Sequence, residues 1–206
     1  VVRDGRAFDV AFRADLVERA GGGLRITDFK TGASFARGTP KTQAKRFAEH
    51  VARGTKLQAV AYALAAGEPG AVGRYLHLAP DAAEDAAPIV DFARDAADAE
   101  ARVADFERAV ATLAQAWEDG VFAPRLSQPA LDVDEPNRAC RTCTVSDACV
   151  RGDAGLRQRH RDWLAGQAER ERAGEALDPA SAAYLAAWKL AAAAPDDGSG
   201  GGEEAG

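Results

Sequence analysis

Residues 24–32 read LRITDFKTG, a run that ends in a carboxylate, an ammonium group and a glycine. Because side chains two positions apart on a β-strand point to the same side, we expect Asp28 and Lys30 to share one face. Residues 7–18 alternate between apolar and polar side chains, and the glycines at 21–23 separate the two runs. Two runs joined by a glycine-rich turn are typical of a β-hairpin. The sequence therefore predicts a hairpin whose second strand ends at Lys30.

Asp15 lies near the end of the first predicted strand, across the hairpin from Asp28. Two carboxylates at short range repel each other unless a cation lies between them, and their hard oxygen atoms favour Mg²⁺ or Mn²⁺. Lys30 could orient or deprotonate an attacking water there, or stabilise charge on a phosphate. These residues indicate metal-assisted phosphodiester hydrolysis. Spacing alone also allows a simpler interpretation, in which Asp15 forms a surface ion pair and Asp28 and Lys30 are ordinary strand-end residues.

Helices and strands follow the hairpin along the chain. Apolar spacing and stop signals predict a helical segment after Thr39, helices over 56–66 and 93–118, a strand over 71–78, a short edge strand over 89–92, and further helices over 156–172 and 180–194. Residues 80–88 and 121–139 are expected to be loops. The tail over 195–206 has the composition of a flexible linker.

The motifs together resemble the PD-(D/E)XK nuclease superfamily in its RecB-like branch. That branch usually carries G-x-x-D, then D-Y-K-T-G, then Q-x-x-x-Y, and this chain has Asp15, DFKTG at 28–32 and QAVAY at 58–62. Phe29 replaces the commoner tyrosine. The resemblance implies an α/β fold of mixed α+β type, with a restriction-endonuclease-like αβββαβ core. Its central mixed sheet would be flanked by helices, and its first helix would precede Val1.

The resemblance also implies roles for individual residues. Asp15, Asp28 and the backbone carbonyl of Phe29 would hold Mg²⁺ or Mn²⁺, and Lys30 would serve the attacking water. Relatives bring a histidine to the metal from the first helix. None of the three histidines (His50, His77 and His160) matches that position, so no role is transferred to them, and His50 is expected at the surface.

Gln58 and Tyr62 are four residues apart, so they share one face of the predicted helix. An amide and a phenol on one face could together contact a DNA backbone beside the metal. For either residue alone, a surface glutamine or a half-buried tyrosine is the simpler interpretation. Their joint position, about thirty residues after Lys30, favours the functional one.

Cys140, Cys143 and Cys149 form a C-x2-C-x5-C motif. An odd number of clustered cysteines argues against a disulfide framework and indicates a metal. Zinc sites and iron–sulfur clusters require four ligands as a rule, and three are visible. AddB-type nucleases, which the chain resembles here, add an upstream cysteine to such a triplet and hold a 4Fe-4S cluster. The resemblance thus implies a fourth cysteine upstream of Val1. Zinc and incidental free thiols are the alternatives.

The formal charge is −6, from 26 basic and 32 acidic residues, which argues against a protein that coats nucleic acid non-specifically. Between residues 25 and 56, however, eight basic residues occur with two acidic ones. This segment is either a functional surface or a result of the arginine-rich composition. No membrane span or signal peptide is evident, so we expect a soluble, cytoplasmic protein. The absence of methionine suggests a fragment of a longer protein.

These observations predict a nuclease core over 1–139, a cysteine segment with C-terminal helices over 140–194, and a flexible tail. The predicted function is Mg-dependent DNA hydrolysis, as an exonuclease of a helicase–nuclease system for DNA repair or recombination. DNA and a helicase domain or subunit would be the partners. One alternative is a non-catalytic, cluster-stapled DNA-binding module, although adjacent carboxylates repel phosphate. Another is a zinc-stapled interaction domain.

Overall fold

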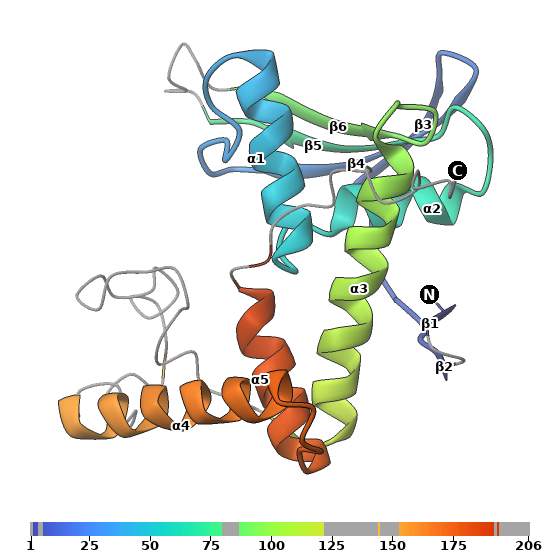
Figure 1. Cartoon of the computed structure of the whole chain (residues 1–206). Helices are drawn as coiled ribbons and strands as arrows, with labels where there is room; N and C mark the ends of the chain where they lie inside the picture. The colour runs from blue at the N-terminus through green and yellow to red at the C-terminus, as the bar shows by residue number, and fades with distance from the viewer. Residues whose placement is uncertain are drawn as a thin grey trace, which may run out of the picture. The chain divides into compact units, whose positions relative to one another are not determined.

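The computed structural model describes residues 2–3, 6–79, 87–121, 144, 153–191 and 193. The chain divides into two compact units, one of residues 1–111 with 193–206 and one of residues 112–192. The first unit combines helices with a β-sheet, and the second contains helices (Figure 1). Every residue of the predicted DNase site lies in the first unit.

The first unit is built on a four-stranded mixed sheet in the order β3-β4-β5-β6. Its strands are β3 (Leu16–Ala20), β4 (Gly23–Lys30), β5 (Val72–His77) and β6 (Ile89–Ala93). β4 and β5 are parallel, whereas β3 with β4 and β5 with β6 are antiparallel. A separate pair consists of β1 (Val2–Arg3) and β2 (Arg6–Ala7). The mixed sheet agrees with the predicted restriction-endonuclease-like fold.

The hairpin of β3 and β4 forms because Gly21 and Gly22 adopt φ of 64° and 90°, in the left-handed region that glycine tolerates best. The prediction of one long strand over 7–18 was wrong in its first part, since residues 8–14 have no regular structure. Tertiary contacts explain the difference. The Phe12 ring lies 4.9 Å from the Tyr62 ring, and the Tyr62 hydroxyl donates to the Arg13 carbonyl at 2.8 Å.

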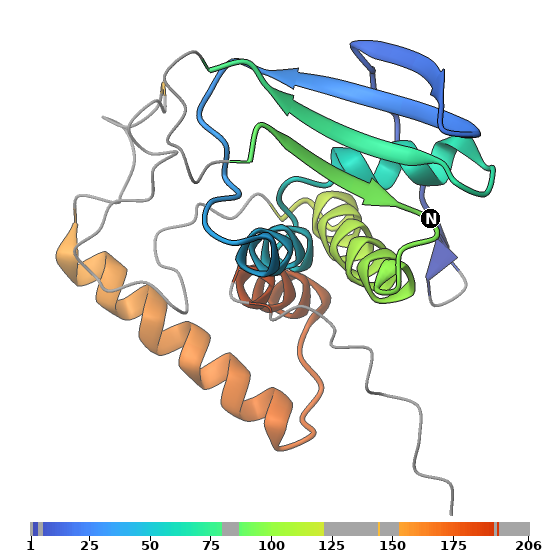
Figure 2. The same ribbon diagram turned by 90° about the horizontal axis from the view of Figure 1, so that it is seen from above.

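The parallel strands β4 and β5 are joined by a crossover that contains α1 (Pro40–Ala52) and α2 (Gln58–Ala66). Such a connection is needed because parallel neighbours cannot be joined by a tight turn. The Thr39 hydroxyl caps α1, and Gly67, at φ 69°, ends α2. Figure 2 shows α1, α2 and the start of α3 on the same face of the sheet.

α2 lies so close to β5 that only glycine fits at position 73. A Cβ atom on Gly73 would be 1.7 Å from the carbonyl oxygen of Ala59 in α2. The core between the helices and the sheet includes Val60 and Tyr75, both fully buried, and Phe106. Phe106 comes from α3 (Ala99–Glu118), which begins six residues later than the predicted 93–118 because β6 extends to Ala93 and a turn follows it.

The second unit contains α4 (Ala154–Arg172) and α5 (Pro179–Leu190), each capped by an aspartate side chain. The Tyr184 ring of α5 packs edge-on against the Trp163 ring of α4 at 5.5 Å, and Lys189 pairs with Glu171. The two predicted helices are therefore confirmed, with α5 ending at Leu190. Cys140, Cys143, Cys149 and most of the predicted loops lie outside the described residues. No helix in the described part of the chain is long and apolar enough to cross a membrane.

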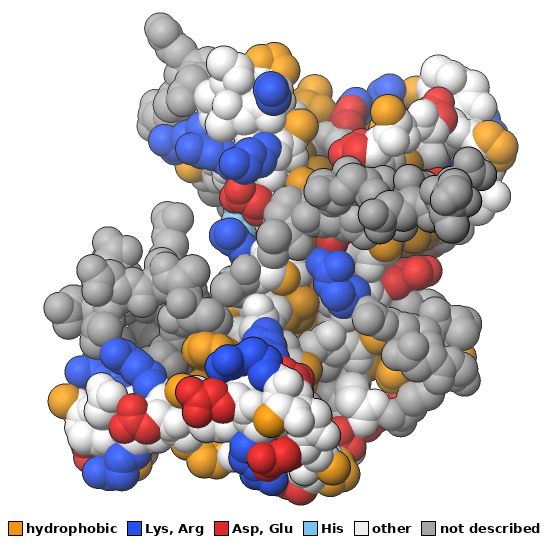
Figure 3. All heavy atoms as spheres, viewed as in Figure 1, with side chains coloured by type: hydrophobic (Ala, Val, Ile, Leu, Met, Phe, Trp, Pro, Cys, Tyr) orange, Lys and Arg blue, Asp and Glu red, His pale blue; other side chains and the backbone are white. Residues whose placement is uncertain are grey.

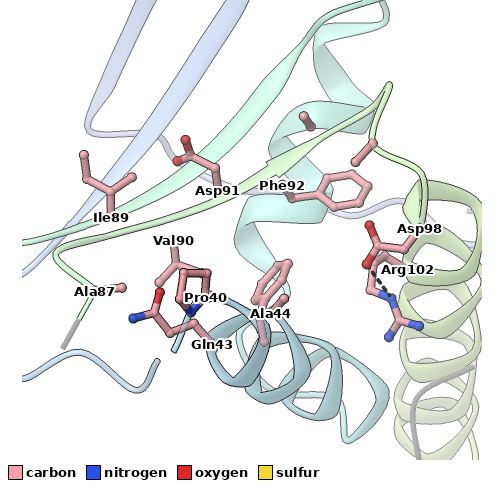
Figure 4. A pocket seen from close by; sticks show the side chains of 13 residues that line it. Pro40, Gln43, Ala44, Ala87, Ile89, Val90, Asp91, Phe92, Asp98 and Arg102 are labelled. Atoms are coloured by element: carbon pink, nitrogen blue, oxygen red, sulfur yellow. Dashed lines mark ion pairs between the residues drawn. The ribbon is translucent and has the colours of Figure 1, made fainter. Parts of the chain in front are cut away.

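A pocket of about 220 Å³ lies between the N-terminal half of α1, strand β6 and the start of α3 (Figure 4). None of the predicted site residues lines it. Its charged side chains are already paired: Asp98 with Arg102 at 3.6 Å, and Asp91 with Arg74 at 2.7 Å. The chemistry predicted from the sequence therefore lies elsewhere, at the end of β4.

Candidate active site

The candidate site lies where β4 ends beneath α2. Strand alternation directs Asp28 and Lys30 to the face that α2 covers and Phe29 to the other face. Asp28 is 6% exposed, whereas Phe29 is 39% exposed. The predicted placement of the carboxylate and the ammonium on one side of the strand is thus found in the structure.

Asp28 is the centre of a connected group of polar side chains. Its Oδ2 lies 2.5 Å from Nζ of Lys30, and its Oδ1 accepts from Nε2 of Gln58 at 2.9 Å. Gln58 also accepts from Lys30 Nζ at 3.0 Å through Oε1. One glutamine side chain therefore holds the carboxylate and the ammonium together.

Tyr62 of α2 also contacts this group. Its hydroxyl lies 3.5 Å from Asp28 Oδ1 and 3.4 Å from Gln58 Nε2, and its best hydrogen bond is to the Arg13 carbonyl. Burial raises the pKa of Tyr62, and the negative charges of Asp28 and Asp15 raise it further, so the phenol stays protonated and donates. Because Tyr62 is fully buried, it orients the group from inside, in contrast to the expected contact with a DNA backbone.

Asp15 extends the hairpin by one position beyond β3. The ladder ends with the pair Leu16 and Thr27, and the Asp15 amide donates to that same Thr27 carbonyl at 3.1 Å, so Asp15 lies at the end of the hairpin. The Asp15 carboxylate accepts from the Phe29 amide at 2.8 Å through Oδ2. Asp15 is therefore held beside the group by the main chain of β4.

The Phe29 carbonyl points toward the same edge as Asp15. The Thr27 carbonyl accepts from Asp15 on the β3 side, and the Lys30 carbonyl accepts from Leu78 on the β5 side. Since successive carbonyls along a strand alternate in direction, the Phe29 carbonyl faces the β3 side. It lies there beyond the last described ladder pair, Leu16 with Thr27. A carbonyl oxygen next to Asp15 is consistent with the expected metal ligand.

These oxygen atoms suit a magnesium ion. Within the described ranges, no group of three or more His, Cys, Asp and Glu side chains could hold a metal. Magnesium, however, is usually held by one or two carboxylates and keeps several waters. Asp28 Oδ2 is buried and makes no hydrogen bond of good geometry, although it lies beside the Lys30 ammonium. Two carboxylates and a carbonyl, all hard donors, therefore fit Mg²⁺ or Mn²⁺.

Lys56 is a charged neighbour of this group that sequence reasoning missed as a site residue. Burial lowers its pKa, the charge of Lys30 lowers it further and the charge of Asp28 raises it, so both charges act on it. Its Nζ lies 5.2 Å from the centre of the Phe35 ring. Residue counting placed Lys56 in the basic segment, but no sequence signal showed where its side chain would lie.

The histidines differ from expectation in their surroundings. His77 pairs with Lys30 in the parallel ladder and is buried, with Nδ1 3.1 Å from the Gly32 carbonyl. His50 was expected at the surface but is half-buried, because its ring packs edge-on against Phe35 at 4.9 Å. Burial lowers the pKa of His50, and the charge of Lys56 adds to this effect. Nothing in the local sequence spacing marks either environment.

Comparison with known proteins gave one family. The model of the PD-(D/E)XK nuclease superfamily matches residues 5–150, which is more than half of the chain and includes the whole mixed sheet. No curated protein and no solved structure matched the chain significantly.

Proposed function

Because the chain belongs to the PD-(D/E)XK nuclease superfamily, whose members are mostly nucleases, we propose that it is a metal-dependent deoxyribonuclease. The observation that carries this proposal is the group at the end of β4. Asp28, Lys30 and Gln58 contact one another there, and Asp15 is bound to the next amide of the same strand. A carboxylate and an ammonium held in this way serve hydrolysis better than fold stability, since a buried ion pair contributes little to stability.

Each residue has a role that its contacts support. Asp15, Asp28 and the Phe29 carbonyl would hold Mg²⁺ or Mn²⁺. Such an ion, when bound, lowers the pKa of water and stabilises charge on phosphoryl oxygens. The Lys30 ammonium would donate a hydrogen bond to the attacking water or to the phosphate. Gln58 fixes Lys30 and Asp28 relative to each other, and protonated Tyr62 holds Asp28 and the segment before Asp15.

A polyanionic substrate is supported by the charge on α1. Lys41, Lys45 and Arg46 are exposed on this helix, and Arg37 is exposed just before it. Figure 3 shows Lys and Arg side chains gathered on the surface over α1. Lysine and arginine contacts to phosphates supply most of the sequence-independent affinity for DNA. A locally positive surface on a chain with a net charge of −6 therefore favours DNA as the substrate.

The proposal extends to the cysteine segment and the biological context. Cys140, Cys143 and Cys149 would supply three of the four ligands of a 4Fe-4S cluster that staples the chain, and the protein would act with a helicase in DNA repair or recombination. The support is the C-x2-C-x5-C spacing within the matched family region. Absorption of the purified protein tests the cluster. A broad band near ~400 nm is expected, and a colourless protein with bound zinc would refute the cluster.

Cleavage of end-labelled linear DNA tests the activity. We expect cutting with Mg²⁺ and none with EDTA, and a loss of about 100-fold or more in Lys30→Ala. Lys189→Ala is the matched control, because Lys189 is an exposed lysine of α5 that pairs with Glu171. Equal cutting by the wild type and Lys30→Ala would refute the catalytic role of Lys30. DNA binding without cleavage by the wild type would instead favour the non-catalytic binding module.

A further inference from the structure

Lys56 has a backbone conformation that lysine rarely adopts. It lies in the turn between α1 and α2 with φ of 55°, and it is the one non-glycine residue at positive φ in the described part of the chain. The left-handed region is disfavoured for residues that carry a Cβ atom, and glycine would fit there without strain. Such outliers concentrate at functional sites, where the surrounding structure holds them. The side chain of Lys56 is therefore the feature to explain.

The Lys56 side chain is directed onto the aromatic residues beside the candidate active site. Its ammonium lies 5.2 Å from the centre of the Phe35 ring, and the Phe35 ring lies 5.7 Å from the Tyr75 ring. Lys30 lies over that same Tyr75 ring at 5.6 Å. The ammonium groups of Lys30 and Lys56 thus lie over two neighbouring aromatic rings, those of Tyr75 and Phe35. A ring face attracts a cation and limits where the ammonium can move.

The two lysines differ in their partners. The Lys30 ammonium forms an ion pair with Asp28 and donates a hydrogen bond to Gln58. Lys56, by contrast, forms no ion pair with any carboxylate among the residues that the structure describes. It lies two positions before Gln58, so the same turn places both side chains. An ammonium that is held beside the candidate site, with no carboxylate partner in the described part of the chain, is suited to bind an anionic group of the substrate.

We propose that Lys56 is a substrate-binding residue whose ammonium binds a phosphodiester group of the DNA strand next to the one that is cleaved. This inference rests on the proposed nuclease function. Lys30 would act at the scissile phosphate, and Lys56 would hold the neighbouring one, so that the strand is fixed at two points. A lysine contact to phosphate carries no sequence information, and its effect is the same for every DNA sequence.

Fluorescence anisotropy with labelled oligonucleotides in EDTA tests the proposal without turnover. Lys56→Gln should weaken binding about fivefold for two unrelated sequences and reduce the slope of log K against log salt concentration by about 1. Lys189→Gln, the same chemical change at an exposed site in α5, should leave both quantities unchanged. Lys56→Arg should retain most of the affinity, because it keeps the positive charge.

A second variant separates lost binding from lost folding. Lys56→Gly relieves the unfavourable backbone conformation, so its unfolding temperature should not fall below that of the wild type, while DNA affinity falls as in Lys56→Gln. If the wild type binds and cuts DNA but Lys56→Gln shows the same affinity and salt slope, the role of Lys56 is refuted and the nuclease function stands. If the wild type neither binds DNA in EDTA nor cuts it with Mg²⁺, both are refuted.

Discussion

The close approach of α2 to β5 makes Gly73→Ala a severe substitution. The added Cβ atom would lie 1.7 Å from the Ala59 carbonyl oxygen, whereas ordinary contact begins at 3.4 Å, so the two elements must separate by about 1.7 Å. Both clashing groups belong to the backbone, and no rotamer change relieves them. We expect a loss of about 3 kcal/mol in the free energy of unfolding, the upper end for overpacking. In a chain of this size, this corresponds to about 10 °C in unfolding temperature.

The same displacement should impair catalysis, because Ala59 is next to Gln58. The hydrogen bonds of Gln58 to Asp28 and Lys30 are 2.9 and 3.0 Å long, and a shift of about 1.7 Å breaks both. Thermal unfolding and DNA cleavage well below the unfolding temperature would measure the two effects. The sign of the stability change is informative, since alanine in a strand that met no obstacle would stabilise the protein by about 0.5–1 kcal/mol.

Gly166→Ala in α4 is the matched control for this experiment. A Cβ atom at Gly166 meets nothing within 4 Å, and alanine is the better helix former. The control should raise the unfolding temperature slightly. A Gly73→Ala protein that is as stable and as active as the wild type would refute the close packing of α2 on β5.

Three further predictions concern the site and its surroundings. Asp28→Asn should reduce cleavage about 100-fold or more. Mg²⁺ should raise the unfolding temperature of the wild type but not that of Asp28→Asn. The control Asp95→Asn changes an exposed carboxylate in a turn and should resemble the wild type in both assays. Gln58→Ala should lower kcat about tenfold and stability by about 1–2 kcal/mol, since Asp28 and Lys30 each lose a hydrogen bond; unchanged kcat would refute the positioning role. In the folded protein, the pKa of His50 is lowered from 6.5. The unfolded chain therefore binds a proton at His50 more readily than the folded protein does. The stability that neutral His50 contributes above pH 6.5 is lost as the pH falls. The fall in unfolding temperature from about pH 7 to about pH 5 should therefore be smaller in His50→Gln, and an identical fall in both proteins would contradict the assignment.

Local periodicity predicted much of the first unit. The turn at Gly21 and Gly22, the helix stop at Gly67 and the edge strand at 89–92 all depend on residues close together in the chain, and all are found. Residues 8–14 alternate like a strand but leave the sheet. The contacts that hold them come from Tyr62, about fifty residues later, and no local pattern encodes such a contact.

The same limit applies to the candidate site. Asp28 with Lys30, and Gln58 with Tyr62, follow from the strand and helix periods, so their mutual contacts could be predicted. His77 reaches Lys30 through the parallel pairing of β4 with β5, which depends on the whole crossover. The Lys56 side chain lies beside the site because its backbone adopts φ of 55°, a conformation that lysine rarely adopts. Their places could not be read from spacing.

The order of the site residues along the chain bears on how the protein is made. Asp15, Asp28, Lys30 and Gln58 all precede residue 66, whereas α2 packs against both β4 and β5, and β5 follows only at 72–77. The reactive groups are therefore synthesised before β5, which completes the surface on which α2 packs. If the chain hydrolyses DNA as proposed, the packing that surrounds its reactive groups is complete only once β5 has joined the sheet.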